Sequence, residues 1–158
     1  MQKHVNFDDH WGNFWPSLVT LQAYFQPPPV GRGWFHDTGN DSASISLLGV
    51  DGTDHLEFAR GRVDIRLSLW GNPDLGVLLI YEKIGGRDRQ AFCSKGDLGR
   101  IREWVRSTHD TSLPVGLFVP FPKAWLAVKE FIETEGRLPE SIEWIKGSDL
   151  PNGTFPDP

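Results

Sequence analysis

The segment from Leu113 to Trp144 constrains the fold of this 158-residue chain more than any other. Val115 to Val119 is a short apolar run with the length and branching typical of a buried strand. Pro120 and Pro122 end that run, and Pro122 suits the first turn of a helix, where its missing N–H is not needed. From Lys123 to Thr134, apolar residues recur at helical spacing, so we expect an amphipathic helix there.

The residues after this helix predict a turn and a further strand. Gly136 is suited to the left-handed conformation that commonly ends a helix. Ile142 and Trp144 alternate with the charged Glu143, which is the pattern of a half-buried strand. The order in this part of the chain is therefore strand, helix, short turn, strand.

The middle of the chain has the patterns of an antiparallel sheet. Val63, Ile65, Leu67 and Leu69 alternate strictly with more polar residues, so one face of that strand should be buried. Gly76 to Tyr81 is apolar on both faces and predicts a central strand, with Gly85-Gly86 turning into a hairpin partner. The further predicted strands are Ile45–Val50, His55–Ala59 and Arg89–Ser94.

Two further helices are predicted. Ser17 to Phe25 can form one after Pro16, and Asp97 can cap another from Leu98 to about Ser107. We expect one α+β domain, with an antiparallel or mixed sheet of five to six strands and two to three helices mainly on one face. Its parts are an irregular, aromatic N-terminal region (1–43), an α+β core (44–150) and a tail (151–158).

The charge of the chain is unevenly distributed along the sequence. The net charge is −5, and residues 1–60 hold three Lys or Arg against seven Asp or Glu, whereas residues 61–158 hold thirteen against fourteen. This balance argues against direct nucleic-acid binding, which needs a basic surface. It favours a basic protein partner, and the alternative is an ordinary domain kept away from zero charge.

Targeting and redox signals are weak. The first fifteen residues lack the apolar region of a signal peptide, and no segment approaches the ~20 apolar residues of a membrane span. Cys93 is the single cysteine, so no internal disulfide can form. We therefore expect a cytoplasmic protein that does not enter a membrane.

None of the candidate catalytic or metal-binding groups forms a convincing constellation. The histidines are scattered, and Asp8-Asp9-His10 would need a third ligand from elsewhere to bind a metal ion. Cys93 lies in a predicted strand, where a thiol usually fills the core. The glutamates at 130, 133, 140 and 143 are best read as solvated groups rather than as an acid–base pair. The expectation is a protein that is not an enzyme and has no metal or cofactor.

Seven tryptophans make the chain rich in indole. Trp104, Trp125 and Trp144 fall on predicted inner faces and should belong to the core. Others lie near acidic residues in the first 60 positions, a combination that suits an interface anchor with a charged rim. The alternative is that this region folds back and caps the sheet. The candidate partner-binding residues are Trp11, Trp15, Trp34, Phe35, Asp37, Asp41, Asp51, Asp54 and Glu57.

The segment LPVGLFVPFPKAWLAVKEFIETEGRLPESIEW, from Leu113 to Trp144, resembles the C-terminal signature of the immunity-protein-one family of bacterial antitoxins. The resemblance implies a small α+β protein that binds and neutralises a cognate toxin, often a nucleic-acid deaminase, by covering its active site or substrate surface. It implies no catalysis and no cofactor. The hypothesis from another class is a small enzyme or ligand-binding domain with a pocket between sheet and helices.

Overall fold

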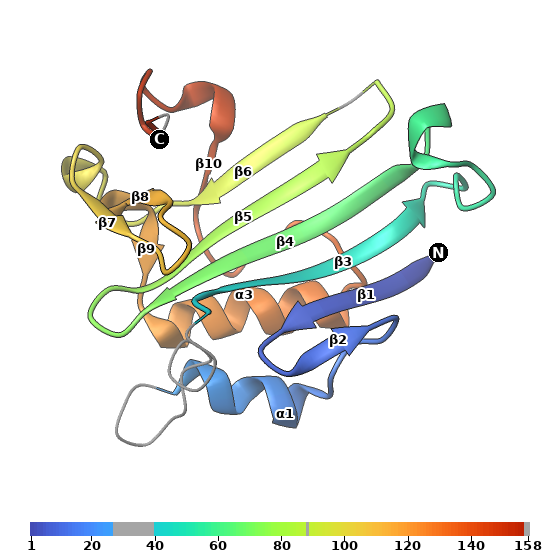
Figure 1. The fold of residues 1–158 in the computed structure, drawn as a ribbon, viewed down its shortest axis with the longest axis horizontal. Helices are drawn as coiled ribbons and strands as arrows, with labels where there is room; N and C mark the ends of the chain where they lie inside the picture. The colour runs from blue at the N-terminus through green and yellow to red at the C-terminus, as the bar shows by residue number, and fades with distance from the viewer. Residues whose placement is uncertain (27–39, 88, 157–158) are drawn as a thin grey trace.

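A curved antiparallel sheet with two α-helices on one face forms the centre of the molecule (Figure 1). The structure is a computed structural model, and it describes residues 1–26, 40–87 and 89–156. Within these residues the large sheet has eight strands, in the order β10-β6-β5-β4-β3-β1-β2, with β9 also paired to β5. Its strands are β1 (Gln2–Phe7), β2 (His10–Gly12), β3 (Ser42–Val50), β4 (Val63–Asn72), β5 (Gly76–Ile84), β6 (Gln90–Ser94), β9 (Phe118–Val119) and β10 (Trp144–Lys146).

The three longest strands lie side by side in the middle of the sheet. In the β4–β5 pair, Leu67 lies opposite Tyr81 and Leu69 opposite Leu79, so the apolar sets of both strands face the same way. The strict alternation of β4 predicts this register, because a shift by one residue would turn every apolar side chain to the other face. At the end of β3, Asp51 and Gly52 both have positive φ and form the tight turn that the Asp-Gly pair predicts.

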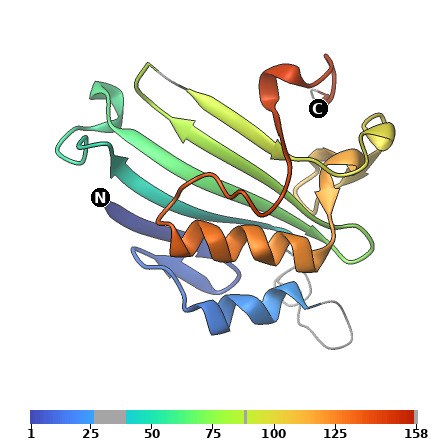
Figure 2. The same ribbon diagram turned by 180° about the vertical axis from the view of Figure 1, so that it is seen from behind.

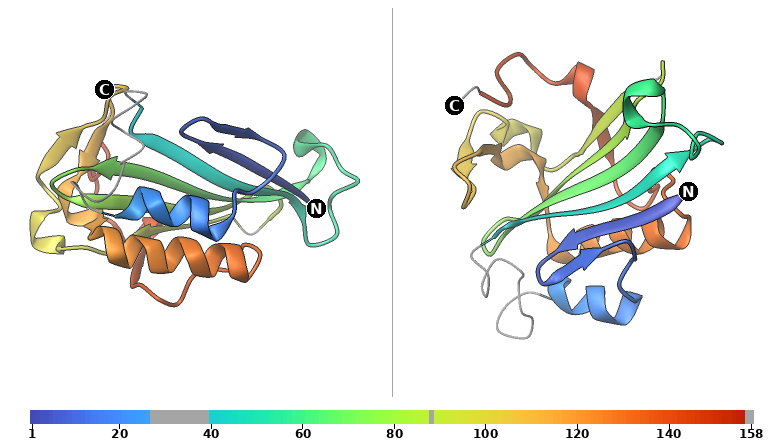
Figure 3. Two further views of the ribbon diagram at one scale, coloured as in Figure 1. Left: turned by 90° about the horizontal axis from the view of Figure 1, so that it is seen from below. Right: turned by 45° about the vertical axis from the view of Figure 1, so that its right-hand side comes forward.

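Both α-helices pack on one face of the sheet, as Figure 3 shows from below. They are α1 (Leu18–Gln22), which continues into the 3₁₀ turn η1 (Ala23–Phe25), and α3 (Phe121–Glu133). The side chains of Leu21, Ala124, Val128 and Phe131 are fully buried against the sheet. The space between sheet and helices is thus filled by side chains.

Figure 2 shows the face of the sheet that the helices cover, and at one end a smaller layer packs on the opposite face. This layer holds η3 (Leu98–Arg100), the two-stranded pair β7 (Trp104–Arg106) and β8 (Ser112–Pro114), and η4 (Val115–Leu117). Leu113, Leu117 and Phe118 pack there against Leu78 and Cys93 of the sheet and form a second apolar cluster. The last element among the described residues is the 3₁₀ turn η5 (Gly147–Asp149).

The predicted α+β class is confirmed, and so is the position of most elements, but the sheet has more strands than the five to six expected. The additional strands come partly from the N-terminal region. Residues 2–7 and 10–12, expected to be irregular, form β1 and β2 and bury Val5 and Phe7 completely. Residues 27–39 of that region lie outside the described part of the chain.

Three predicted elements are wrong. The helix expected over Leu98–Ser107 is a 3₁₀ turn followed by β7, because Asp97 caps only the single turn to Gly99, with a hydrogen bond of 3.0 Å. His55–Ala59 is not a strand but a turn leading into η2 (Phe58–Arg60). Val115–Val119 is buried as predicted, but η4 and the two-residue β9 replace the continuous strand.

Neither α-helix of the described residues has the length and apolar content that crossing a membrane requires.

Candidate protein-binding surface

The structure separates the predicted partner-binding residues. Trp11 lies on the edge strand β2 and is 73% exposed. Trp15 is half-buried. Its indole N–H lies within hydrogen-bonding reach of the carbonyl oxygens of His4 (3.2 Å) and Ser46 (3.1 Å). Trp34, Phe35 and Asp37 fall in the residues that are not described. Trp15 therefore supports the fold, whereas Trp11 is free to meet a partner.

Asp41 has a structural role. It is 7% exposed, and its carboxylate accepts hydrogen bonds from the Thr108 N–H (3.1 Å) and hydroxyl (2.9 Å). Its own carbonyl oxygen accepts a bond from the N–H of Gly71. A carboxylate held in this way ties the start of β3 to the loop after β7 and offers little to another protein.

Asp51, Asp54 and Glu57 are exposed in the loop between β3 and β4, but each has a cationic neighbour. Asp51 lies 2.6 Å from the Lys83 ammonium, Glu57 lies 3.8 Å from Arg60, and Asp54 lies 3.2 Å from the N-terminal ammonium. The hydrogen bond from the N-terminus lowers the pKa of Asp54. Much of the negative charge that the sequence places in the first 60 residues is therefore balanced locally.

Carboxylates that form no ion pair with a described residue follow one another at the end of α3 and in the turn after it, although Glu143 lines a hollow together with Lys95, Arg100 and Lys123. We define the α3 carboxylate cluster as Glu130, Glu133, Glu135, Glu140 and Glu143. Among the described residues, none of the ion pairs involves a member of this cluster. Residues 130–143 contain one cationic side chain, Arg137.

The position of the cluster is electrostatically unfavourable for the helix. The last turn of α3 contains no basic residue, although the C-terminal end of a helix carries a partial negative charge that cations stabilise. Glu130 and Glu133 bring like charge to this end. The Glu140 N–H compensates Glu130 in part, but none of the ion pairs among the described residues involves Glu133. A residue that lowers stability in this way is typical of a functional surface.

The backbone beneath the cluster is held firmly. The Tyr81 hydroxyl of β5 donates a hydrogen bond of 2.7 Å to the carbonyl oxygen of Gly136, which has φ +91°. A Cβ atom at Gly136 would lie 2.7 Å from Leu47, so the turn packs directly on the sheet. The Glu140 N–H donates to the Glu130 carboxylate, and the Trp144 indole donates to Pro139 O at 2.7 Å. The carboxylates are therefore presented by an ordered segment.

An apolar hollow of about 480 Å³ is lined in part by residues next to the cluster in the chain. Leu138 and Trp144, which flank Glu140 and Glu143 in the chain, line it together with Phe92, Leu98 and Ile145. Lys95, Lys146 and Asp149 complete its rim. An apolar centre with a charged rim has the composition of a protein-binding surface.

The Cys93 thiol lies in an apolar environment, within the second apolar cluster. Burial, reinforced by Glu82, raises the pKa of the Cys93 thiol to about 12, so the nucleophilic thiolate is disfavoured. In the described parts of the chain, His, Cys, Asp and Glu side chains do not form groups of three or more that could hold a metal ion.

In the sequence alone, the glutamates at 130, 133, 140 and 143 have the pattern of an ordinary solvated face. The available signal was positional, because acidic residues concentrate where the helix rule favours basic ones. The prediction that Trp104 belongs to the core is wrong. It is 40% exposed, since the helix expected to bury it does not form, and its indole N–H donates to Thr154 O at 2.9 Å.

The fold and this surface define a small α+β protein with an ordered acidic segment after α3 and an apolar hollow whose rim holds Lys95, Lys146 and Asp149. A protein-family model described as Immunity protein Imm1 matches residues 96–146, about a third of the chain. This match confirms the family resemblance of the C-terminal sequence and includes the whole α3 carboxylate cluster. No curated protein and no solved structure matches the chain.

Proposed function

We propose that this chain is an immunity protein that binds a cognate bacterial toxin and neutralises it by covering its active site or substrate-binding surface. The match of residues 96–146 to the Imm1 family carries this proposal. The α3 carboxylate cluster supports it, because the same segment presents negative charge that no described ion pair balances. Inhibition by coverage needs no chemistry from this chain, which therefore acts without catalysis, metal or cofactor, in the cytoplasm.

The proposed toxin acts on nucleic acid, as a deaminase does. Any enzyme of that kind must present positive potential to phosphates. The α3 carboxylate cluster is complementary to such a surface and would compete for it directly. Long-range attraction between the two would also speed their association.

The apolar hollow beside Trp144 would supply the anchor. Interface energy usually concentrates where an aromatic or aliphatic side chain fills a desolvated pocket, while the charged rim contributes orientation and rate. We propose that an apolar side chain of the toxin enters this hollow and that basic residues around it meet Glu140 and Glu143. Because the cluster is already ordered, little conformational entropy would be lost on binding.

The exposed members of the N-terminal set are a second proposed contact. Trp11, Asp51, Asp54 and Glu57 are accessible, and surface ion pairs such as Glu57–Arg60 are weak enough to exchange partners. We propose the same role for Trp34, Phe35 and Asp37, which lie outside the described residues. Trp15 and Asp41 are excluded, because their polar groups are engaged within the fold.

The test is inhibition of the toxin encoded beside this gene, with two triple variants that remove equal charge. One is Glu133→Gln, Glu140→Gln, Glu143→Gln. Its charge-matched control is Asp51→Asn, Asp54→Asn, Glu57→Gln, which removes the carboxylates of the weaker, second contact. If rim charges contribute about 0.5–1 kcal/mol each, the first variant should bind the toxin roughly ten- to a hundred-fold more weakly. The control should lose less, within about threefold of the wild type, because each of its carboxylates already has a cationic neighbour in the fold.

Three outcomes of this test would contradict parts of the proposal. A stable complex that both variants preserve would refute the α3 carboxylate cluster as the contact. A larger loss in the control would move the interface to the N-terminal set. Failure of the wild-type chain to bind or inhibit the neighbouring toxin would refute the function itself. The alternative of a ligand pocket between sheet and helices has little support, because buried side chains fill that space.

A further inference from the structure

No strand or α-helix of the described residues covers the face of the sheet opposite α3 at the end away from β7 and β8 (Figure 1). Two rows of side chains cross β3, β4 and β5 on this face, Leu48–Asp64–Ile84 and Ser46–Arg66–Glu82. Along β4 they alternate with Ile65 and Leu67, which pack in the core beneath the helices. A hollow of about 330 Å³ lies over both rows, and Phe58 and Arg89 also line it.

One wall of this hollow is apolar. Leu48 and Ile84 are half-buried and lie on either side of Asp64 in the same row. Phe58 of η2 is 53% exposed, and the Arg62 guanidinium lies 6.0 Å from the centre of its ring. An exposed ring beside two aliphatic side chains is a surface that the apolar part of a ligand would remove from water.

The Asp64 carboxylate inside the hollow is already satisfied. The Arg62 guanidinium donates two hydrogen bonds to it, of 2.9 and 3.0 Å, one to each carboxylate oxygen. The Gly49 N–H donates a third bond of 3.0 Å. Because this bidentate pair balances the charge of Asp64, a bound anion would meet little repulsion from it.

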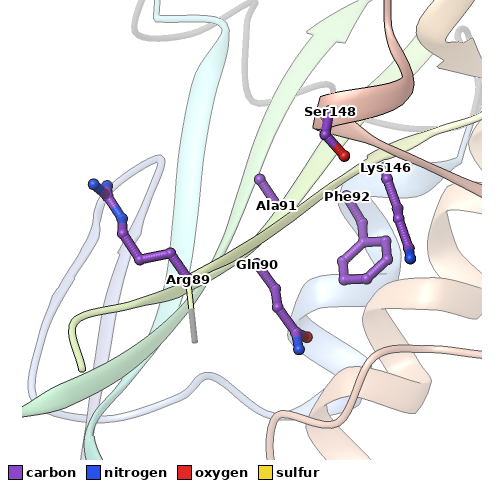
Figure 4. Close-up of a pocket in the computed structure, with 7 residues that line it drawn as sticks. Arg89, Gln90, Ala91, Phe92, Lys146 and Ser148 are labelled. Atoms are coloured by element: carbon purple, nitrogen blue, oxygen red, sulfur yellow. The ribbon is translucent and has the colours of Figure 1, made fainter. Parts of the chain in front are cut away.

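Arginine is in excess over carboxylate around the hollow. The Arg66 guanidinium donates to the Glu82 carboxylate at 3.1 Å, a contact that uses one of its five N–H groups. Arg89 takes part in no ion pair with a described residue, and Figure 4 shows it projecting to the opposite side of the strand from Gln90. With Arg62 included, three arginines face two carboxylates, so one positive charge is unbalanced.

We infer that this hollow is a binding site for a small organic acid. Its carboxylate would reach Arg66 and Arg89, and its apolar body would lie against Leu48, Phe58 and Ile84. Arginine suits this task, because the guanidinium fork matches the geometry of a carboxylate. The volume lies at the lower end of the range for ligand pockets, which favours a molecule with a single ring or a short chain. The inference concerns the face opposite the helices and does not depend on a toxin.

The test is a titration of the full-length protein with 3-phenylpropanoate, followed by amide NMR signals. The signals of residues 46–48, 64–66 and 82–84 should shift together as the acid is added. The matched probes are 3-phenylpropan-1-ol and 3-phenylpropylamine, which keep the ring and the chain but lack the carboxylate. Both should bind at least about tenfold more weakly than the acid.

Variants at exposed positions separate the cation from the apolar wall. Arg89→Gln should weaken binding of the acid about tenfold or more. Arg87→Gln removes the same charge from an exposed neighbour that does not line the hollow and should change the affinity by less than about twofold. Phe58→Ala should weaken binding roughly three- to tenfold. Its control is Val19→Ala, whose side chain on α1 is 82% exposed and which should leave the affinity unchanged.

Four results would overturn the inference. The first is the absence of shifts at millimolar acid, and the second is an equal response to the acid, the alcohol and the amine. The third is a set of shifts confined to residues 144–146, which would place the acid in the hollow beside Trp144. The fourth is unchanged affinity in Arg89→Gln. Thermal unfolding of each variant checks that a lost response does not reflect a lost fold.

Discussion

The role of an acidic side chain in this molecule depends on what surrounds it. Asp41 and Asp54 lie within fourteen positions of each other, and the sequence gives both the same candidate role. The structure buries Asp41 among the hydrogen bonds from Thr108 and leaves Asp54 at the surface beside the N-terminus. Because Asp41 is buried and accepts hydrogen bonds from uncharged donors, its carboxylate has a structural role.

Replacing Asp41 should therefore cost stability. Asp41→Ala would leave the Thr108 N–H without its acceptor in a half-buried site, and we expect the free energy of unfolding to fall by about 1–3 kcal/mol. Asp54→Ala, which breaks an exposed ion pair, should change it by less than about 0.5 kcal/mol. Urea denaturation of both variants measures the difference. Equal losses would show that Asp41 is not a structural anchor.

Tyr81 links the core to the α3 carboxylate cluster, and its ionisation should be visible in stability. Burial, together with Asp51, raises the pKa of the Tyr81 hydroxyl from 10.0 to about 12. Because the folded state disfavours the phenolate, this contribution to stability is complete below pH 10 and is lost as the pH rises toward 12. Over that interval the wild type should lose up to about 1.4 kcal/mol per pH unit more than Tyr81→Phe.

The same substitution has an effect at neutral pH. Tyr81→Phe removes the donor to Gly136 O and should lower the free energy of unfolding by about 1 kcal/mol near pH 7. Urea denaturation of wild type and variant from pH 7 to 11.5 tests both effects. Cys93 also titrates in this range but is present in both proteins, so its contribution cancels. Parallel pH curves would contradict the assignment.

Individual residues could be assigned from the sequence where a local pattern decided their environment. Ile142 and Trp144 flank the charged Glu143, and the structure packs both against the core. Trp104 has equally apolar neighbours, yet its exposure depends on whether residues 98–107 form a helix, which no local pattern decides. The sequence shows the acidic end of α3 by its position in the helix. Only the folded chain shows that other acids are balanced, because Lys83, Arg60 and the N-terminus lie beside them.

At the scale of elements, the best prediction concerned α3, whose amphipathic pattern and Gly136 stop both appear in the structure. A long periodic pattern predicts a helix reliably because burial of one face supplies most of its stability. Residues 98–107 show the opposite case. Their apolar residues have helical spacing, but Gly99 weakens a helix, and tertiary packing places Leu98, Ile101 and Val105 against the second apolar cluster in another conformation.

The acidic side chain of Glu133 should destabilise the C-terminal end of α3. Glu133→Lys replaces a like charge with an opposite one at the negative end of the helix, and we expect the free energy of unfolding to rise by about 0.3–1 kcal/mol. Glu140→Lys carries the same charge change outside the helix and should have a smaller effect. Thermal denaturation at low and high salt measures both, and the difference should shrink as salt increases.

A stabilising Glu133→Lys would show that the native residue is retained at a cost. Toxin binding should weaken in the same variant, as expected where function and stability compete. If Glu133→Lys instead destabilises the protein and leaves binding unchanged, the cluster neither weakens the end of the helix nor contacts the toxin.

For the whole molecule, the net charge does not show where unpaired charge lies on the surface. The sequence places its excess of acids in residues 1–60, yet local pairing leaves the α3 carboxylate cluster as an unbalanced negative region on another part of the surface. Long-range steering depends on unbalanced charge, and salt screens it with a Debye length of about 8 Å at physiological ionic strength. The kinetics of toxin binding should therefore report the α3 carboxylate cluster rather than the composition.

We expect the association rate constant of the wild-type protein with its toxin to fall by about tenfold or more between 20 mM and 500 mM salt, while the dissociation rate constant changes little. In the Glu133→Gln, Glu140→Gln, Glu143→Gln variant this dependence should become much flatter. The Asp51→Asn, Asp54→Asn, Glu57→Gln control has the same net charge and should keep most of the wild-type slope, because its carboxylates are balanced by cationic neighbours in the fold. Stopped-flow measurements with all three proteins distinguish the cases, because equal flattening in both variants would mean that net charge alone, and not its arrangement in the fold, drives the encounter.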